Sequence, residues 1–185
     1  LIKLVENVLA VSKFQSKENY VYKSISVNSS IKSVIPIVQQ QYKNYKIVTD
    51  FNEKLPPIIV DNNNFQQIII NLVENACKYS KDGSEVKVKT NFAPNDFVSI
   101  KVIDHGVGIK EEDKEKIFEK FSRIDNPLTR EVQGSGLGLY ITKNLVENMN
   151  GKINVESSEN GTTFEVLMPI GDIENQARAK CAPKH

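Results

Sequence analysis

Apolar and polar residues alternate along this chain with two different periods, and these periods predict where its helices and strands lie. Near the start, apolar residues recur at positions 1, 4, 5, 8 and 9, the spacing of one face of an α-helix. Helical spacing predicts helices over residues 1–17, 30–45, 62–79, 111–118 and 137–150. Strand-like stretches cover residues 23–27, 46–51, 57–60, 86–92, 97–104, 152–157 and 162–169.

Capping and turn residues refine these boundaries. Asp61 is predicted to cap the third helix, and Ser29 or Ser30 the helix before it. A turn at 160–161 joins the last two strands, and the two strands before the fourth helix form a second antiparallel pair. Helices and antiparallel strand pairs occupy separate stretches of chain. This arrangement favours an α+β fold, in which helices pack on one face of a mixed sheet.

The composition is that of a globular protein with little net charge. Of the 185 residues, 39% are apolar and 25% are charged, and the formal net charge is +1. No bulk field exists to attract nucleic acid, so we expect no such partner, and any phosphate site must be local. Two cysteines without metal-ligand spacing fit a reducing compartment, and the apolar runs are too short to span a membrane. We therefore expect a cytoplasmic location.

The first candidate site is a row of polar residues on the third helix. Asn71, Asn75 and Lys78 recur at i, i+4 and i+7 and so share one face, and Tyr79 follows them. An amide oxygen can bind Mg²⁺ without adding charge, and a lysine supplies a counter-charge for phosphate. The alternative is a solvated helix face that binds nothing.

The second candidate site follows a strand. The even positions of the strand over 97–104 are apolar, so Asp104, which continues that row, is predicted to point inward. A buried carboxylate needs hydrogen-bond donors, and the exocyclic amine of adenine is a suitable one. Gly106 and Gly108, followed by Ile109, allow unusual backbone angles and the close approach of a flat ring. An ordinary Asp-Gly turn is the alternative.

The third candidate site is a glycine-rich segment that opens the last helix. Its residues are Gly134, Ser135, Gly136, Leu137, Gly138 and Leu139. Backbone N–H groups at such a segment, together with a helix N-terminus, suit an anion. A charged loop precedes the segment instead of a strand, so the context of a dinucleotide fingerprint is absent, and the ending of a P-loop is missing too. A hinge before a helix is the alternative.

The irregular, charged segment before that helix is long enough to indicate a functional loop. Phe118 and Phe121 are expected to pin its ends to the domain. Lys120, Arg123 and Arg130 are expected to reach phosphates when it closes, unless the loop is simply solvated.

The last strand carries one further candidate. Thr162 shares strand parity with Phe164, Val166 and Met168, so its hydroxyl is expected to face inward near the second site. Thr163 takes that place if the register is shifted by one residue.

Taken in order, these five motifs resemble the N, G1, F, G2 and G3 boxes of sensor histidine kinases, over roughly residues 1–170. The resemblance implies a Bergerat-type two-layer α/β sandwich with a flexible ATP lid over 119–135, and ATP bound with Mg²⁺. It also implies a domain plan. Residues 1–20 would belong to a dimerisation and phosphoacceptor hairpin, residues 21–170 would form the catalytic ATP-binding domain, and residues 171–185 would be a tail or linker.

The resemblance also assigns roles by position. The residues implied to bind the nucleotide are Asn71, Asn75, Lys78, Tyr79, Asp104, Gly106, Gly108, Ile109, Lys120, Arg123, Gly134, Ser135, Gly136, Leu137, Gly138, Leu139 and Thr162. Among them, Asn75 would bind Mg²⁺ and Asp104 would accept from the adenine amine. Asn71, Lys78 and Arg123 would be catalytic, with Arg123 near the γ-phosphate.

The implied partners are a histidine-bearing hairpin domain, a response regulator and, in the full-length protein, a second copy of the chain. The family's phosphoacceptor histidine lies upstream of Leu1, and neither His105 nor His185 occupies such a position. We therefore expect the chain to be the catalytic half of a longer protein, whether or not that protein is anchored in a membrane. Two alternatives stay open. A GHKL-type ATP hydrolase would have Glu at the position of Asn71, and a nucleotide-sensing pseudokinase would bind ATP without turnover.

Overall fold

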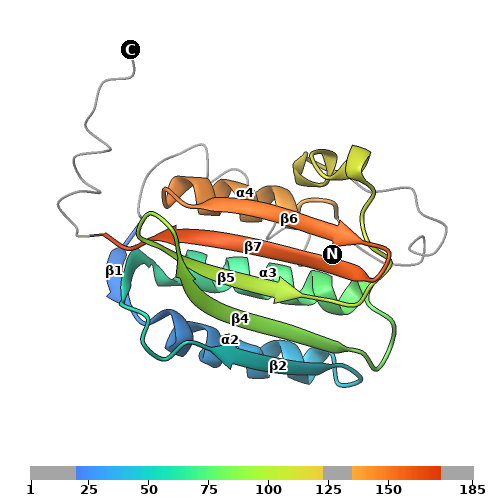
Figure 1. The fold of residues 1–185 in the computed structure, drawn as a ribbon, viewed down its shortest axis with the longest axis horizontal. Helices are drawn as coiled ribbons and strands as arrows, with labels where there is room; N and C mark the ends of the chain where they lie inside the picture. Colours follow the sequence, from blue (N-terminus) through green and yellow to red (C-terminus); the bar gives the residue numbers. More distant parts are fainter. Residues whose placement is uncertain (1–19, 123–134, 172–185) are drawn as a thin grey trace, which may run out of the picture.

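The computed structural model describes residues 20–122 and 135–171. A five-stranded sheet has three α-helices on one of its faces (Figure 1). Across the sheet, the strands run in the order β2 (Lys46–Phe51), β4 (Glu85–Ala93), β5 (Phe97–Ile103), β7 (Gly161–Pro169) and β6 (Lys152–Ser158). β2 is parallel to β4 and the other neighbours are antiparallel, so the predicted mixed sheet and α+β class are confirmed.

The helices are α2 (Val27–Gln41), α3 (Asn62–Tyr79) and α4 (Gly138–Asn148). A separate antiparallel pair, β1 (Tyr22–Ile25) with β3 (Ile58–Asp61), adjoins the first turns of α2 and α3. Two 3₁₀ turns, η1 (Glu111–Asp113) and η2 (Lys116–Phe118), stand where one short helix was predicted. None of the helices in the described ranges is long and apolar enough to cross a membrane.

The cap of α3 was predicted correctly, whereas that of α2 was wrong. Asp61 accepts from the backbone N–H of Asn64 at 3.0 Å. α2 begins three residues earlier than expected, because Ser26 is its N-cap and accepts from the N–H of Ser29 at 3.4 Å. Ser30 is instead buried in the helix, where its hydroxyl donates to the side-chain oxygen of Asn62 at 2.7 Å.

The core lies between the helices and the sheet. Its fully buried large side chains include Phe65, Ile68 and Leu72 of α3, Ile141 and Leu145 of α4, Ile100 of β5 and Met168 of β7. Even-numbered residues of β5 and β7 face this core, as the alternation predicted. The ends of both strands are therefore placed directly against α3 and α4.

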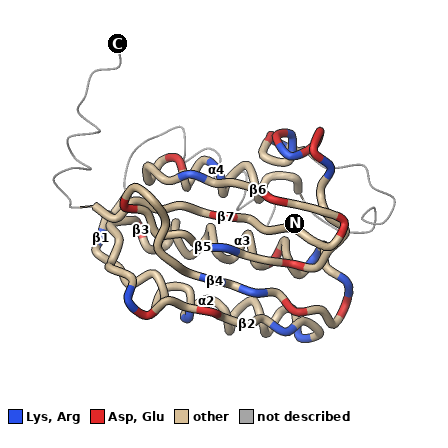
Figure 2. Tube along the Cα trace, in the orientation of Figure 1, with Lys and Arg blue, Asp and Glu red and all other residues tan. Residues whose placement is uncertain are grey.

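The opposite face of the sheet carries charged residues of both signs, which Figure 2 shows interspersed along the chain. Lys89 lies 3.2 Å from Asp50, and Lys101 lies 3.4 Å from Glu165 on the neighbouring strand. Exposed pairs of this kind contribute little to stability, and they leave no large surface of a single charge on these strands.

Several sequence predictions lie outside the described residues. They are the helix over 1–17, all but the first residue of the tail over 171–185, most of the lid, and the site residues Arg123, Arg130 and Gly134.

Candidate functional site

Asp104 lies at the end of β5 with its side chain directed inward, as predicted, and it is only 5% exposed. Its Oδ1 accepts two backbone hydrogen bonds, from the N–H of Gly106 at 2.8 Å and from the N–H of Thr162 at 3.1 Å. Neither bond involves Oδ2. That oxygen is therefore an acceptor that a ligand amine can use.

The environment of Asp104 works against its ionised form. Burial raises the pKa of this carboxyl above its ordinary value, although the two N–H donors from Gly106 and Thr162 lower it. A donor arriving at Oδ2 would further stabilise the carboxylate, so the site favours a ligand with an N–H group at this point.

Thr162 faces inward as expected, whereas Thr163 is half-buried on the other side of the strand. The Thr162 hydroxyl lies 2.9 Å from the hydroxyl of Ser157, its partner across the β6–β7 hairpin. Ser157 Oγ also accepts from the N–H of Ile109 at 2.8 Å. Ser157 thus links the loop after β5 to the hairpin. The sequence predictions did not include Ser157, because a two-residue turn at 160–161 would place Glu159 opposite Thr162, whereas the observed pairing of Ser158 with Gly161 brings Ser157 there.

The absence of side chains at two glycines lets these loops converge. A Cβ on Gly106 would meet the carbonyl oxygen of Tyr79 and would lie 3.0 Å from Oδ1 of Asp104. Gly161 has a φ of 138°, and a Cβ there would meet the carbonyl oxygen of Asp104. The close approach predicted at Gly106 is therefore an approach of its backbone to the last residue of α3, Tyr79.

Asn71 and Asn75 lie one turn apart on α3 but differ in their surroundings. Asn71 is 8% exposed, and both the oxygen and the nitrogen of its amide make hydrogen bonds. It accepts from Gln67 Nε2 at 2.8 Å and donates to Thr142 Oγ1 at 3.3 Å and to the carbonyl oxygen of Gly138 at 3.4 Å. Asn75 is half-buried, and its side chain makes no hydrogen bond to any residue within 20–122 or 135–171. Of the two, Asn75 is the one whose oxygen is available to a cation.

Lys78 and Tyr79 complete the predicted row on α3. Lys78 Nζ lies 3.8 Å from Oε2 of Glu74, which is itself only 5% exposed. Tyr79 is 41% exposed. Lys78 therefore has a carboxylate partner on its own helix.

The N-terminus of α4 differs from those of the other two described α-helices. Side chains cap α2 and α3, but Leu137 at the N-cap of α4 makes no such bond. The first N–H groups of a helix have no partner within it, and those of α4 have no acceptor among residues 20–122 and 135–171. A Cβ on Gly138 would have no atom within 4 Å, so the space beside this turn is open.

The residues around this turn have distinct positions. The Leu137 side chain is 1% exposed and belongs to the core, so only its backbone can face a ligand. Its N–H donates to Ser135 Oγ at 3.3 Å. Gly136 packs against the backbone of Phe121, which brings the two ends of the predicted lid side by side, and Leu139 is half-buried.

Only one of the two phenylalanines pins the predicted lid. The Phe118 ring packs edge-on against Phe164 with centroids 6.4 Å apart. The prediction for Phe121 is wrong, because its side chain is 67% exposed and its φ is 61°. Lys120 Nζ lies 5.1 Å from the ring centroid of Tyr140 on α4, a contact that the sequence did not indicate.

The donor set fits Mg²⁺ with a nucleotide better than it fits a metal bound by protein alone. The described residues contain no group of three or more His, Cys, Asp or Glu side chains that could hold a metal ion. An amide oxygen such as that of Asn75 suits Mg²⁺ that keeps waters and takes its remaining ligands from phosphates.

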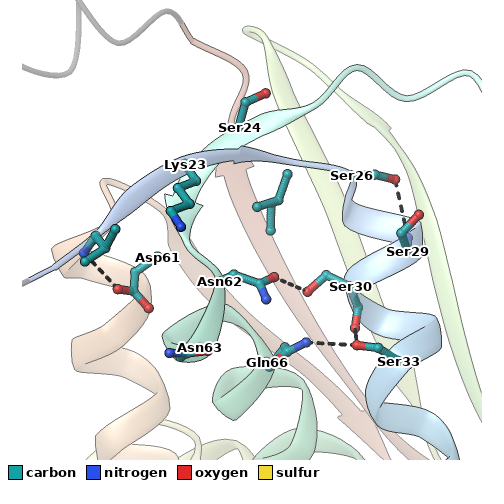
Figure 3. Close-up of a pocket in the computed structure, with 12 residues that line it drawn as sticks. Lys23, Ser24, Ser26, Ser29, Ser30, Ser33, Asp61, Asn62, Asn63 and Gln66 are labelled. Carbon is teal, nitrogen blue, oxygen red and sulfur yellow. Dashed lines mark hydrogen bonds between the residues drawn. The ribbon is translucent and has the colours of Figure 1, made fainter.

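A hollow of about 580 Å³ lies at the other end of α3, between β1 and the first turns of α2 and α3 (Figure 3). Hydrogen bonds from Ser30 to Asn62 and from Gln66 to Ser33 cross its wall. Its position is about 20 Å from Asn75 along the helix axis, so it is separate from the site described above.

Comparison with known proteins identifies the family. A family model described as "Histidine kinase-, DNA gyrase B-, and HSP90-like ATPase" matches residues 60–172, more than half of the chain. The chain belongs to this family. The histidine kinase-like ATPase match thus includes the end of β3, all of α3, the Asp104 loop and the α4 N-terminus.

Relatives of this ATPase domain are sensor kinases. The signal transduction histidine-protein kinase ArlS of Staphylococcus haemolyticus is 33% identical over 172 residues, which cover 90% of this chain and 37% of ArlS. Among solved structures, full-length ShkA in complex with AMPPNP has a TM-score of 0.77 at 25% identity, covering 90% of this chain and 35% of that one. The catalytic domain of histidine kinase ThkA has a TM-score of 0.71 at 27% identity, covering 80% of this chain and 95% of that one.

These comparisons confirm the predicted sandwich fold and the resemblance to the catalytic domains of sensor histidine kinases. ThkA has also been solved in complex with the response regulator protein TrrA. The chain spans little more than a third of the length of the ArlS relatives that it matches.

Proposed function

We propose that this ATPase domain binds ATP with Mg²⁺ and transfers the γ-phosphoryl group to a histidine on a helical hairpin domain. The observation that carries this proposal is the buried carboxylate of Asp104, beside two loops that converge on it, whose Oδ2 makes no hydrogen bond to residues 20–122 or 135–171. A buried charge of this kind is costly unless a donor reaches it, and the amine of adenine is such a donor. The resemblance of ShkA, solved with AMPPNP, supports the same ligand.

Each residue then has a physical task. Asp104 orients the base through its Oδ2. Asn75 offers an unbonded amide oxygen to Mg²⁺, which when bound neutralises charge on the phosphates. Lys78 adds a counter-charge from the same helix. The free N–H groups at the start of α4, beside Gly138, bind phosphate oxygens with the favourable end of the helix dipole.

The remaining nucleotide contacts are proposed from the motifs alone. They involve Asn71, Tyr79, Gly106, Gly108, Ile109, Lys120, Arg123, Gly134, Ser135, Gly136, Leu137, Leu139 and Thr162. Asn71, Lys78 and Arg123 are also proposed to be catalytic. For Leu137 the contact is through its backbone, because its side chain is in the core.

Phosphoryl transfer needs positioning and charge stabilisation more than covalent chemistry from the protein. The nucleophile is the imidazole of a histidine that the hairpin domain brings to the site, and docking of that domain supplies the orientation. We propose that the full-length protein is a dimer, that its catalytic half works in the cytoplasm, and that a response regulator receives the phosphoryl group. The ThkA–TrrA complex supports the last of these partners.

A single mixture tests the proposal. The chain is incubated with Mg²⁺, radiolabelled ATP and a separate hairpin fragment that carries the histidine. Label on the hairpin histidine supports the kinase. Release of free phosphate without labelled hairpin would indicate a hydrolase, and binding without either product would indicate a sensor module; both results contradict the proposal. A hairpin with the histidine replaced by alanine is the control.

A further inference from the structure

One hydrogen-bonded link joins α3 to the first turn of α4, and it passes through Thr142. This residue is completely buried. Its hydroxyl donates to the carbonyl oxygen of Gly138 at 2.9 Å and accepts from Asn71 Nδ2 at 3.3 Å. The same amide nitrogen of Asn71 also reaches the Gly138 carbonyl, at 3.4 Å, while Gln67 occupies its oxygen.

The link engages both ends of the Asn71 amide. Its nitrogen is directed at two neighbouring acceptors on α4, and its oxygen accepts from its own helix. Asn75, one turn along, makes no side-chain hydrogen bond to a described residue. Two asparagines of the same motif therefore have different roles in this structure, one as part of the framework and one open to a ligand.

The position of the link gives it a consequence for binding. Gly138 is the first residue of α4, and the N-cap residue before it, Leu137, makes no side-chain cap hydrogen bond. Since the partner of Asn71 is the carbonyl of that residue, the link sets where those N–H groups lie relative to Asn75 on α3. Hydrogen bonds from these N–H groups to phosphate oxygens weaken steeply away from their preferred distance and angle, so displacement of the α4 N-terminus should weaken phosphate binding.

We propose that Thr142 is a positioning residue for the phosphates: with Asn71 it fixes the α4 N-terminus against α3, and it touches no ligand itself. This inference rests on the proposed binding of ATP. It predicts that the hydroxyl of Thr142 matters for the phosphate end of the nucleotide and not for the base, since the base is oriented by Asp104 from a different loop.

The test compares ATP with AMP, both with Mg²⁺, by NMR or calorimetric titration of the whole chain. Thr142→Val keeps the shape and removes the hydroxyl. We expect it to raise the Kd for ATP by about fivefold, the effect of one net hydrogen bond, and to leave the Kd for AMP within about twofold of wild type. Thr142→Ser keeps the hydroxyl and should therefore bind ATP as tightly as the wild-type chain.

Thr90→Val is the matched control. Thr90 is also a buried threonine, 1% exposed, whose hydroxyl donates to an asparagine, Asn28 Oδ1, at 2.8 Å. It lies on β4, outside the site. Its loss should lower the melting temperature and leave both dissociation constants unchanged, which separates destabilisation from misplacement of the α4 N-terminus.

Asn71→Ala removes the same link from the α3 side, and it takes the place of Thr142→Val in the titrations if that variant does not fold. Combined with Thr142→Val, it should add little further loss, because both remove one interaction. The inference would be overturned if Thr142→Val weakened the binding of ATP and AMP equally, or if it left ATP binding unchanged. The proposed function would stand in either case. Failure of the wild-type chain to bind ATP would overturn both.

Discussion

Replacing Asp104 with asparagine tests the centre of the site with almost no change in shape. The asparagine Oδ1 can still accept from the N–H groups of Gly106 and Thr162, which hold the present Oδ1 at 2.8 and 3.1 Å. Its Nδ2 then takes the place of Oδ2. A donor therefore faces the adenine amine, which is also a donor, and both lose their partner.

The size of the effect follows from the two losses. A hydrogen bond to a charged group contributes about 1.5–3 kcal/mol, and a buried donor left unpaired costs about 1–3 kcal/mol. Taking about 3 kcal/mol as a moderate total, the Kd for ATP should rise by roughly 100-fold. Because Nδ2 can donate to a carbonyl, the preference for ATP over GTP should fall in the same variant.

Stability should change in the opposite direction. Because burial raises the pKa of Asp104 in the folded chain, the ionised carboxylate costs stability, and this cost appears as the pH rises through that folded-state pKa. Asparagine has no such titration. Asp104→Asn should therefore unfold at a higher temperature than wild type near pH 7, and this advantage should shrink in acid.

The measurements are calorimetric titration with ATP and Mg²⁺, and thermal unfolding at several pH values. Asp96→Asn, in the turn between β4 and β5, is a control that removes one carboxylate from an exposed position. A variant that binds ATP as tightly as wild type would refute the assignment of Asp104 to the base. A variant less stable than wild type at neutral pH would refute the account of its buried charge.

Three further predictions concern the same region. Asn75→Ala should abolish Mg²⁺-dependent ATP binding with an unchanged melting temperature, and loss of the fold would instead make this residue structural. Burial and the nearby charges of Glu74 and Asp104 raise the pKa of Cys77 to about 12. In a Cys181→Ser background, the Cys77 thiol should therefore react with a disulfide reagent only as fast as the chain unfolds. Rapid reaction at pH 8 would contradict this. Gly161→Ala should destabilise the chain by about 1–3 kcal/mol in urea unfolding, because its Cβ would meet the Asp104 carbonyl.

The local elements could be predicted well, because they depend on short stretches of sequence. The boundaries of α3, the inward direction of Asp104 and the choice of Thr162 over Thr163 follow from period and parity, and the structure agrees with each. The start of α2 was missed for a local reason. Ser26, Ser29 and Ser30 are all suitable N-cap residues by type, and the hydrogen bond of Ser30 to Asn62 favours its position inside the helix.

Contacts between distant segments decided the rest. Helical spacing places Asn71 and Asn75 on one face and does not distinguish them. The packing of α4 buries the Asn71 side chain and leaves that of Asn75 half-buried. Sequence gave no sign that Thr142 lies beside Asn71, since 71 residues separate them. Chain periodicity thus determined which residues belong to helices, strands and candidate motifs. The three-dimensional packing alone decided which polar atoms are already paired and which remain for a ligand, because hydrogen bonds and burial depend on neighbours that are remote in the chain.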